Sequence, residues 1–394
     1  MPRLGGAVIL SNVNNTPLRV FDDQIVEFLS KMSAELMRSP LIRQYPDLAA
    51  FAFYIRLANL LKLKETQGDL SGRLGRGLCF HIAPANIPIN FAFSWVFSLL
   101  AGNANVVRLP SKDYSQVAAL LAVINKHLMH NPELAARNAF VRYPRTDIET
   151  TAAYSMMADC RMIWGGDGTI ATVRALPVKP RCLDIAFADR YSIGLINGQA
   201  VLEADESTLM RLAQDFYNDT YLMDQNACSS PQLVLWENDS DVARQKFWNA
   251  VFVCARERYS LQDAVSVDKF TALCEESVDN LRVRSVDRRE NLLYRIELSS
   301  LDARLMDHRG KAGFFFEYAL KSRQELFDVV TEKYQTVTQF GIDAVALREE
   351  IVSANLCGID RIVPFGKAMD IGSVWDGFDL VQMLSRIIMV GKGG

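Results

Sequence analysis

The segment LCFHIAPANIP, residues 78–88, sets the architecture of the chain. Its first five residues form an uncharged run typical of a buried strand, and its two prolines fix the backbone of the turn that follows. After the turn, an apolar segment from Ile89 to Ala101 has the length of a helix. A strand that turns directly into a helix predicts the first half of a unit in which the next strand runs parallel to the first.

The alternation of strand and helix continues after this segment. Runs typical of strands, each separated from the next by a helix-like pattern, lie at 105–109, 139–143, 161–164 and 183–188. This order predicts a parallel sheet with helices on both faces. We therefore expect an α/β fold of the doubly wound type, in which ligands bind beyond the carboxyl ends of the strands.

The second half of the sequence contains further runs of both kinds. Helical spacing is found near 205–221, 240–258, 266–276, 343–355 and 376–388, and strand-like runs lie at 233–236, 281–286, 292–298, 313–318, 326–330, 336–340 and 360–363. We expect a cofactor domain with N-terminal helices (1–198), a catalytic α/β domain (199–365) and a C-terminal segment (366–394) that returns to the cofactor domain. The active site is expected in the cleft between the two domains.

The composition restricts the classes of protein. The 394 residues carry a formal net charge of −3, with 49% hydrophobic and 23% charged residues. This is the composition of a folded protein of two or three domains, and the charge gives no reason to expect a nucleic-acid partner. The longest apolar run, Ile89 to Ala101, is too short and too interrupted by polar residues to span a bilayer.

The cysteines and histidines point to a reducing compartment without a metal site. Seven cysteines are scattered without a CxxC pair, and the sequence begins without the pattern of a secretory leader. We therefore expect a cytoplasmic protein with free thiols. None of the four histidines has the spacing to a cysteine that a zinc site requires, so no metal is expected.

One cysteine, Cys228, stands in a connection between secondary-structure elements. It belongs to MDQNACSSPQ, residues 223–232, which follows the helical pattern of 205–221 and precedes the strand 233–236. A thiol in a loop on a rigid frame is a candidate for covalent catalysis. The alternative is a small buried apolar residue, the usual role of a free cysteine, and the local sequence alone favours this alternative.

Polar residues follow the strands of the first half, where ligands are expected. Asn86 stands between the two prolines of the turn, where its amide is either an oxyanion donor or the cap of the next helix. Arg108 ends the next strand, and Ser111 and Lys112 follow it. Basic residues at this edge accommodate the 2'-phosphate of NADPH, whereas a solvated turn with a helix cap at Ser111 is the alternative.

A glycine-rich turn, Gly165 to Gly168, follows the strand 161–164 and precedes a helix. Gly165 and Gly166 would let the backbone approach a pyrophosphate at the helix N-terminus. The same pattern also occurs in tight turns that bind nothing, and it is neither a GxGxxG motif nor a P-loop. The turn alone is therefore a weak indication of a nucleotide.

Six short motifs, read together, resemble those of the aldehyde dehydrogenase superfamily. They are the PxNxP turn, the GNxxVxR strand, the glycine turn, DQNACSSPQ, EKYQTV at 332–337 and PFG at 364–366, and they occur in the order found in that superfamily. The sequence is most similar to the acyl-CoA reductase branch, the LuxC-type fatty-acid reductase, from about Phe21 to the C-terminus. The resemblance implies an aldehyde-dehydrogenase-like fold and NADPH-dependent reduction of an acyl thioester to the aldehyde.

The resemblance implies roles for individual residues. Cys228 is implied to be the nucleophile that accepts the acyl group, Asn86 and the Cys228 backbone N–H to form the oxyanion hole, and Glu332 to contact the nicotinamide ribose. The further residues expected at the cofactor are Pro84, Arg108, Ser111, Lys112, Gly165 and Gly166. Arg108 stands where the superfamily usually has a lysine, which is also cationic but differs in shape. NADPH is the expected cofactor, with NADH as the alternative, and coenzyme A is the expected leaving group.

One departure from the superfamily bears on the reaction. Aldehyde-oxidising members carry a Glu-Leu-Gly-Gly-Lys segment whose glutamate activates water, whereas this sequence has Ala186-Phe187-Ala188-Asp189-Arg190 at the corresponding place. Without that base, attack of water on an acyl-cysteine is expected to be slow, so thiol exchange and reduction are favoured over hydrolysis. Two alternatives stay open: an NAD-dependent aldehyde dehydrogenase, and a thiol acyltransferase or acyl-binding subunit that transfers no hydride.

The resemblance also implies partners. The acyl donor is expected to be acyl-CoA or an acylated partner protein, with an acyl-protein synthetase as a candidate. The polar, glycine-rich stretch 66–77 is expected to be a hinge, a hairpin or an extension toward another subunit, and the family resemblance favours a homo-oligomer, a dimer or a tetramer.

Overall fold

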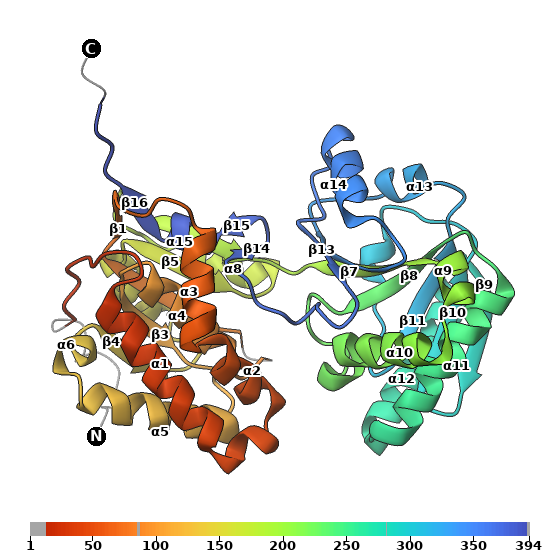
Figure 1. The fold of residues 1–394 in the computed structure, drawn as a ribbon, viewed down its shortest axis with the longest axis horizontal. Coiled ribbons are helices and arrows are strands. Elements are labelled where there is room, and N and C mark those ends of the chain that lie inside the picture. Colours follow the sequence, from red (N-terminus) through yellow and green to blue (C-terminus); the bar gives the residue numbers. More distant parts are fainter. Residues whose placement is uncertain (1–12, 85–86, 281, 392–394) are drawn as a thin grey trace. The chain divides into compact units, whose positions relative to one another are not determined.

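The computed structural model describes residues 13–84, 87–280 and 282–391, which form two compact units. Unit 1 comprises Met1–Ala188 together with Ile371–Gly394, and unit 2 comprises Asp189–Asp370 (Figure 1). The division differs from the expected boundaries. Strand β7 (Tyr191–Asn197) belongs to unit 2 because it pairs with two strands of that unit, and the loop 366–370 belongs there because buried polar groups of unit 2 bind it.

The core of unit 1 is a parallel sheet of five strands. The strand order is β4 (Asn138–Val141), β3 (Ala104–Arg108), β2 (Leu78–Ile82), β5 (Cys160–Trp164) and β6 (Leu183–Phe187), and all neighbours are parallel, as the alternating sequence predicts. The chain adds strands on one side of β2 and then returns to add β5 and β6 on the other side. The strand order therefore reverses between β2 and β5, the position where doubly wound sheets bind ligands.

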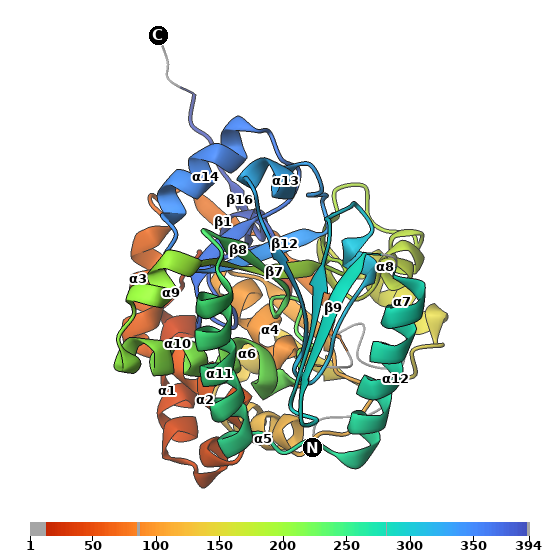
Figure 2. The same ribbon diagram turned by 90° about the vertical axis from the view of Figure 1, so that its right-hand side faces the viewer.

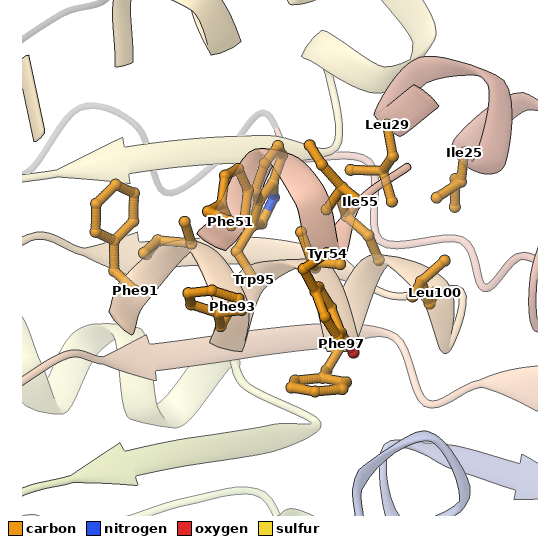
Figure 3. Packing of buried hydrophobic residues seen from close by; sticks show 14 of the residues in the cluster. Ile25, Leu29, Phe51, Tyr54, Ile55, Phe91, Phe93, Trp95, Phe97 and Leu100 are labelled. Carbon is orange, nitrogen blue, oxygen red and sulfur yellow. The ribbon is translucent and has the colours of Figure 1, made fainter. Parts of the chain in front are cut away.

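Helices cover both faces of this sheet. One face packs on α1 (Asp23–Arg38), α2 (Pro46–Tyr54), α3 (Leu57–Thr66), α4 (Asn90–Leu100) and α5 (Ser115–Met129), and the other packs on α7 (Ile148–Met157) and α8 (Asp167–Arg174). All 11 residues of α4 are buried, since this helix lies between the sheet and the N-terminal helices. Figure 3 shows its aromatic residues packed against those of α2. Short helices lie at Pro40–Arg43 and Pro132–Ala135.

The C-terminal segment returns to unit 1. Strand β16 (Ser385–Ile387) pairs antiparallel with β1 (Arg73–Gly75), so the stretch 66–77 contributes one strand of a two-stranded ribbon (Figure 1). The helix expected near 376–388 is confined to α15 (Leu380–Met383). Asp376 and Gly377 have positive φ angles and form the turn between β14 (Val374–Trp375) and β15 (Phe378–Asp379), which a helix could not contain.

Unit 2 contains a sheet of seven strands. The order is β13 (Arg361–Pro364), β12 (Tyr334–Phe340), β7, β8 (Pro231–Glu237), β11 (Phe314–Ala319), β10 (Leu293–Leu298) and β9 (Val283–Arg289). All neighbours are parallel except β9 and β10. The run 326–330, expected as a strand, instead contains the end of helix α13 (Arg323–Phe327).

The sheet of unit 2 is also covered on both faces. One face packs on α9 (Gly198–Glu203), α10 (Glu206–Thr220) and α11 (Asp241–Arg258), and the other on α12 (Asp263–Asp279), α13 and α14 (Ala344–Ser353) (Figure 2). Phe314 and Phe316 face one layer and Phe315 faces the other, which confirms that this run belongs to the core. Short helical turns lie at Tyr221–Met223 and Leu305–Asp307.

In the part of the chain that the structure describes, the helices are either too short or too polar to cross a membrane.

Gly102, in the GNxxVxR motif, provides a test of the packing in unit 1. Its φ is +88°, and a Cβ atom there would lie 2.2 Å from the Leu18 carbonyl oxygen. Gly68 has a φ of +70° but no atom within 4 Å of its Cβ position. Gly68→Ala should therefore lower the free energy of unfolding by the left-handed strain alone, about 1 kcal/mol, and Gly102→Ala by clearly more. Urea denaturation compares the two, and equal losses would contradict this account of Gly102.

Candidate active site

The loop that carries Cys228 is held in a strained conformation. It connects α10 to β8, and both Asp224 and Gln225 have left-handed φ angles, +50° and +59°. The amide of Gln225 donates to the carbonyl oxygens of Pro231 and Phe314 at 3.3 and 3.0 Å, and its oxygen accepts from the N–H groups of Gly313 and Phe314 at 3.0 and 3.1 Å. This buried side chain therefore joins the loop to the start of β11, and such strain is found where surrounding contacts enforce it.

A second set of hydrogen bonds holds the cysteine and its neighbour in place. The buried hydroxyl of Ser192, on β7, donates to the Cys228 carbonyl oxygen at 2.7 Å and accepts from the Thr336 backbone N–H at 3.3 Å. The hydroxyl of Ser230 donates to the Asp219 carbonyl oxygen at 2.7 Å. The backbone on both sides of the thiol is thus tied to β7, β12 and α10.

The thiol of Cys228 is half-buried, and the side-chain amide of Gln335 lies beside it. The distance from Gln335 Nε2 to Cys228 Sγ is 3.5 Å. Neither Ser192 nor Gln335 was identified from the sequence, because a polar residue within a strand gives no sign of which neighbour it meets. The only signal was that Gln335 lies within the motif EKYQTV.

The other cysteines have different surroundings. Cys79, Cys160 and Cys254 are buried, and Cys274 and Cys357 are exposed. The neighbouring Cys79 thiol, together with burial, raises the pKa of Cys160, and burial raises the pKa of Cys182 to about 11. Thiols of this kind stay protonated at neutral pH and are poor nucleophiles.

A loop after β13 is folded around a buried side chain, Asp219, and a half-buried one, Arg361. The carboxylate of Asp219 accepts from the backbone N–H groups of Gly366 and Ala368 at 2.7 and 3.0 Å. The guanidinium of Arg361 donates to carbonyl oxygens of residues 367, 368 and 370. Gly366 has a φ of +83°, and a Cβ atom there would lie 2.6 Å from the Asp215 carboxylate, so no other residue fits. The PFG motif is thus a packing requirement of this loop.

The residues at the place of the missing glutamate form ion pairs. Asp189 accepts two hydrogen bonds from the Arg309 guanidinium, at 3.0 and 2.8 Å. Arg190 pairs with Asp360 and donates to the Tyr334 carbonyl oxygen at 2.8 Å. Both carboxylates, Asp189 and Asp360, thus already have an arginine partner.

Most of the expected cofactor residues lie at one edge of the unit 1 sheet. Pro84 follows β2, Arg108 ends β3, and Gly165 and Gly166 join β5 to α8. Burial lowers the pKa of Arg108, whose guanidinium lies 4.6 Å from the centre of the Tyr143 ring. The structure thus brings these residues together where the strand order reverses.

The space at Gly166 fits a bound nucleotide. Its φ is not in the left-handed region, and a Cβ atom there would have no neighbour within 4 Å, so neither the backbone nor the packing requires glycine. A pyrophosphate that approaches the N-terminus of α8 would explain the residue. Ser111 and Lys112 are exposed in the turn after β3, and the Lys112 ammonium lies 5.2 Å from the Tyr114 ring centre.

The two remaining expected residues are placed differently. Glu332 is exposed in the turn before β12, in unit 2. Asn86 lies outside the described residues. No group of three metal-ligating side chains occurs in residues 13–84, 87–280 and 282–391.

The family of the chain is established by its sequence. The family described as Acyl-CoA reductase (LuxC) matches residues 56–387, and the chain belongs to it. The protein is therefore an aldehyde-forming acyl-CoA reductase, as the resemblance implied. No curated protein sequence matches the chain closely enough to add a relative.

Solved structures of aldehyde dehydrogenases share the fold. A mutant of 1-pyrroline-5-carboxylate dehydrogenase from Thermus thermophilus has a TM-score of 0.64 at 10% identity, covering 93% of this chain and 80% of its own. Aldehyde dehydrogenase 21 from Physcomitrella patens, in complex with its reaction product succinate, has a TM-score of 0.63 at 10% identity, with 93% and 85% covered. Lactaldehyde dehydrogenase from Escherichia coli has a TM-score of 0.61 at 13% identity, with 88% and 79% covered. These similarities confirm the fold class.

Asp219 provides a test based on pH. Burial raises the pKa of its carboxyl group from 3.8 to about 7, so the folded protein keeps a proton that the unfolded chain loses near pH 4. The stability contributed by this group is present below about pH 4 and is lost as the pH rises to about 7, by about 1 kcal/mol per pH unit. In urea denaturation between these pH values, Asp219→Asn should remove this slope. Equal slopes in both proteins would contradict the raised pKa.

Proposed function

We propose that the chain reduces an acyl thioester to an aldehyde through an acyl-enzyme on Cys228, with NADPH as the hydride donor. The observation that carries the proposal is the loop of Cys228, which Gln225 and Ser192 hold in a strained conformation with the thiol beside a side-chain donor. Fixed nucleophiles of this kind reduce the entropy cost of the attack.

The nucleophile of the proposed acyl transfer is Cys228 of unit 2. The Cys228 thiolate would attack the carbonyl carbon of acyl-CoA, and coenzyme A would leave, so that one thioester replaces another. The backbone N–H of Cys228 and the amide of Asn86 are the proposed donors to the oxyanion. The hydrogen bond from Ser192 to the Cys228 carbonyl oxygen supports this role, because it holds the peptide that follows Cys228 and so restrains the backbone next to the proposed donor.

Hydrolysis of the acyl-enzyme would be slow. The position of the superfamily's glutamate is Ala186, which has no base, and Asp189 is occupied by Arg309. The acyl group would therefore persist until it is reduced. After reduction, the bond between the Cys228 sulfur and the former acyl carbon would break, releasing the aldehyde and restoring the thiolate.

The residues of unit 1 would hold the cofactor. Gly165 and Gly166 would meet the pyrophosphate, and Arg108, Ser111 and Lys112 the ribose and its 2'-phosphate, which favours NADPH over NADH. Pro84 would line the same edge, and Glu332 of unit 2 is the proposed partner of the nicotinamide ribose. Bound NADPH would supply the hydride that the chain's own side chains cannot provide.

Substitution of single cysteines tests the nucleophile. Cys228→Ala should abolish both acyl-enzyme formation and NADPH-dependent aldehyde formation from acyl-CoA. Cys274→Ala, which removes an exposed thiol, is the matched control and should retain both. Aldehyde formation by the Cys228→Ala protein would refute the proposal. Acylation without NADPH oxidation in the wild type would instead indicate a thiol acyltransferase.

Substitution of two glycines distinguishes a loss of cofactor contact from a general effect on folding. Gly166→Ala should weaken NADPH binding, measured by fluorescence titration, about tenfold or more, since loss of ~1.4 kcal/mol has that effect. Gly168→Ala adds a methyl group to equally open space in α8 and should leave the affinity unchanged. Unchanged NADPH affinity in Gly166→Ala would contradict the assignment of this edge.

A further inference from the structure

A buried donor lies beside the Cys228 sulfur. Nε2 of Gln335 is 3.5 Å from Sγ, and Gln335 is only 2% exposed. It is the second residue of β12, where its carbonyl oxygen accepts from the Asp360 backbone N–H at 2.9 Å. Because β7 and β13 pair with β12 on its two sides, the amide extends from a fixed backbone. A donor held in this way stabilises a thiolate more than a thiol, since hydrogen bonds to charged atoms are stronger.

A positively charged residue lies on the strand next to Gln335, because Arg361 is the register partner of Thr336, which follows Gln335 on β12. The guanidinium of Arg361, at the start of β13, donates to three carbonyl oxygens of the loop 367–370 at 2.8, 2.8 and 2.6 Å. These carbonyl oxygens fix the position of the guanidinium. Burial lowers the pKa of Arg361, while the charges of Asp370, Asp219 and Cys228 act in the opposite direction. Arginine stays protonated in proteins, so Arg361 keeps its positive charge on the strand next to β12.

We propose that Gln335 and Arg361 together stabilise the thiolate of Cys228. Gln335 would be a catalytic residue, because it contacts the sulfur, and Arg361 a positioning residue, which acts through its charge and through the loop that it holds. These roles rest on the proposed function, in which Cys228 accepts the acyl group. Gln335 and Arg361 would activate Cys228 by favouring its thiolate, since the thiolate is the reactive form of a cysteine.

The pair would act at both ends of the reaction. In acyl transfer, the Cys228 thiolate forms a C–S bond, the C–S bond to coenzyme A breaks, and the coenzyme A thiolate takes up the proton that Cys228 gave to solvent. In aldehyde release, the bond to Cys228 breaks and its electron pair returns to the sulfur. Both events require a stabilised sulfur anion, which is nucleophile in the first and leaving group in the second.

The neighbouring carboxyl groups moderate this effect. The charges of Asp219, from α10, and Asp370, from the loop after β13, act on the Arg361 guanidinium. Asp219 has a pKa of about 7 and is thus partly neutral at physiological pH. The two carboxyl groups near Arg361 therefore carry less than two full negative charges. The dependence of Cys228 reactivity on pH should be recorded both in the wild type and in a variant in which Asp219 does not titrate.

Alkylation of Cys228 by iodoacetamide as a function of pH measures the thiolate directly. The whole chain is used without acyl-CoA, and the modified Cys228 peptide is quantified by mass spectrometry, which separates it from Cys274 and Cys357. Gln335→Glu, of nearly the same shape, and Arg361→Met should each move the midpoint of the alkylation profile upward by about one pH unit, a roughly tenfold loss of thiolate at neutral pH. The shift should persist in an Asp219→Asn background.

Two further variants separate activation from folding. Arg361→Lys keeps the charge and should restore most of the alkylation rate that Arg361→Met loses. Lys321→Met removes an exposed cation of unit 2 outside this loop and should leave the midpoint unchanged. Unchanged midpoints in Gln335→Glu and Arg361→Met overturn the inference, as does a shift of equal size in Lys321→Met. Failure of the wild type to accept an acyl group would refute the proposed function alone, because the alkylation profile does not depend on acyl-CoA.

Discussion

The bond from the Ser192 hydroxyl to the Cys228 carbonyl is the contact on which the site in unit 2 depends. This hydrogen bond connects the loop after α10 to β7. The Ser192 hydroxyl oxygen also accepts a hydrogen bond from the Thr336 backbone N–H on β12. Gln225 adds a second connection to β11 while its own backbone is left-handed. The positive φ angles of Asp224 and Gln225 cost free energy that these buried hydrogen bonds offset. The loop that carries the thiol is therefore hydrogen-bonded to three parallel strands of one sheet, β7, β11 and β12.

The proposed reduction of an acyl group without hydrolysis agrees with the residues at the place of the superfamily's glutamate. A thioester on Cys228 is protected when no base activates water, and the chain has Ala186 at the relevant place and an engaged Asp189 after it. Activation of the thiol must then come from groups that do not also activate water. An amide and an arginine meet this condition, because neither accepts a proton at neutral pH.

The sequence predicted the parts of the fold whose periodicity is regular. The strands of unit 1 alternate with helices, so the parallel sheet and its cover of helices on both faces could be predicted. Strand β7 could not be assigned to unit 2, because it follows β6 without a helix and contains Gly194. A Cβ atom at this position would make a tight contact, 3.0 Å, with the Phe365 ring. Cys228, Arg108 and Gly166 are candidates from their positions beside strands, and only the resemblance to the superfamily gives Cys228 its proposed role. The roles of Ser192, Gln335 and Arg361 depend on contacts between strands that are distant in the sequence, which the sequence does not show.

Intact-mass spectrometry of the chain after incubation with acyl-CoA, before and after addition of NADPH, is the most direct test of the acyl-enzyme. The account predicts a mass increase equal to one acyl group, located on Cys228 by peptide analysis and stable in water without NADPH. Addition of NADPH should remove it and yield one aldehyde for each acyl group lost. Aldehyde formation without any acylated intermediate, or acylation of another residue, would contradict the account.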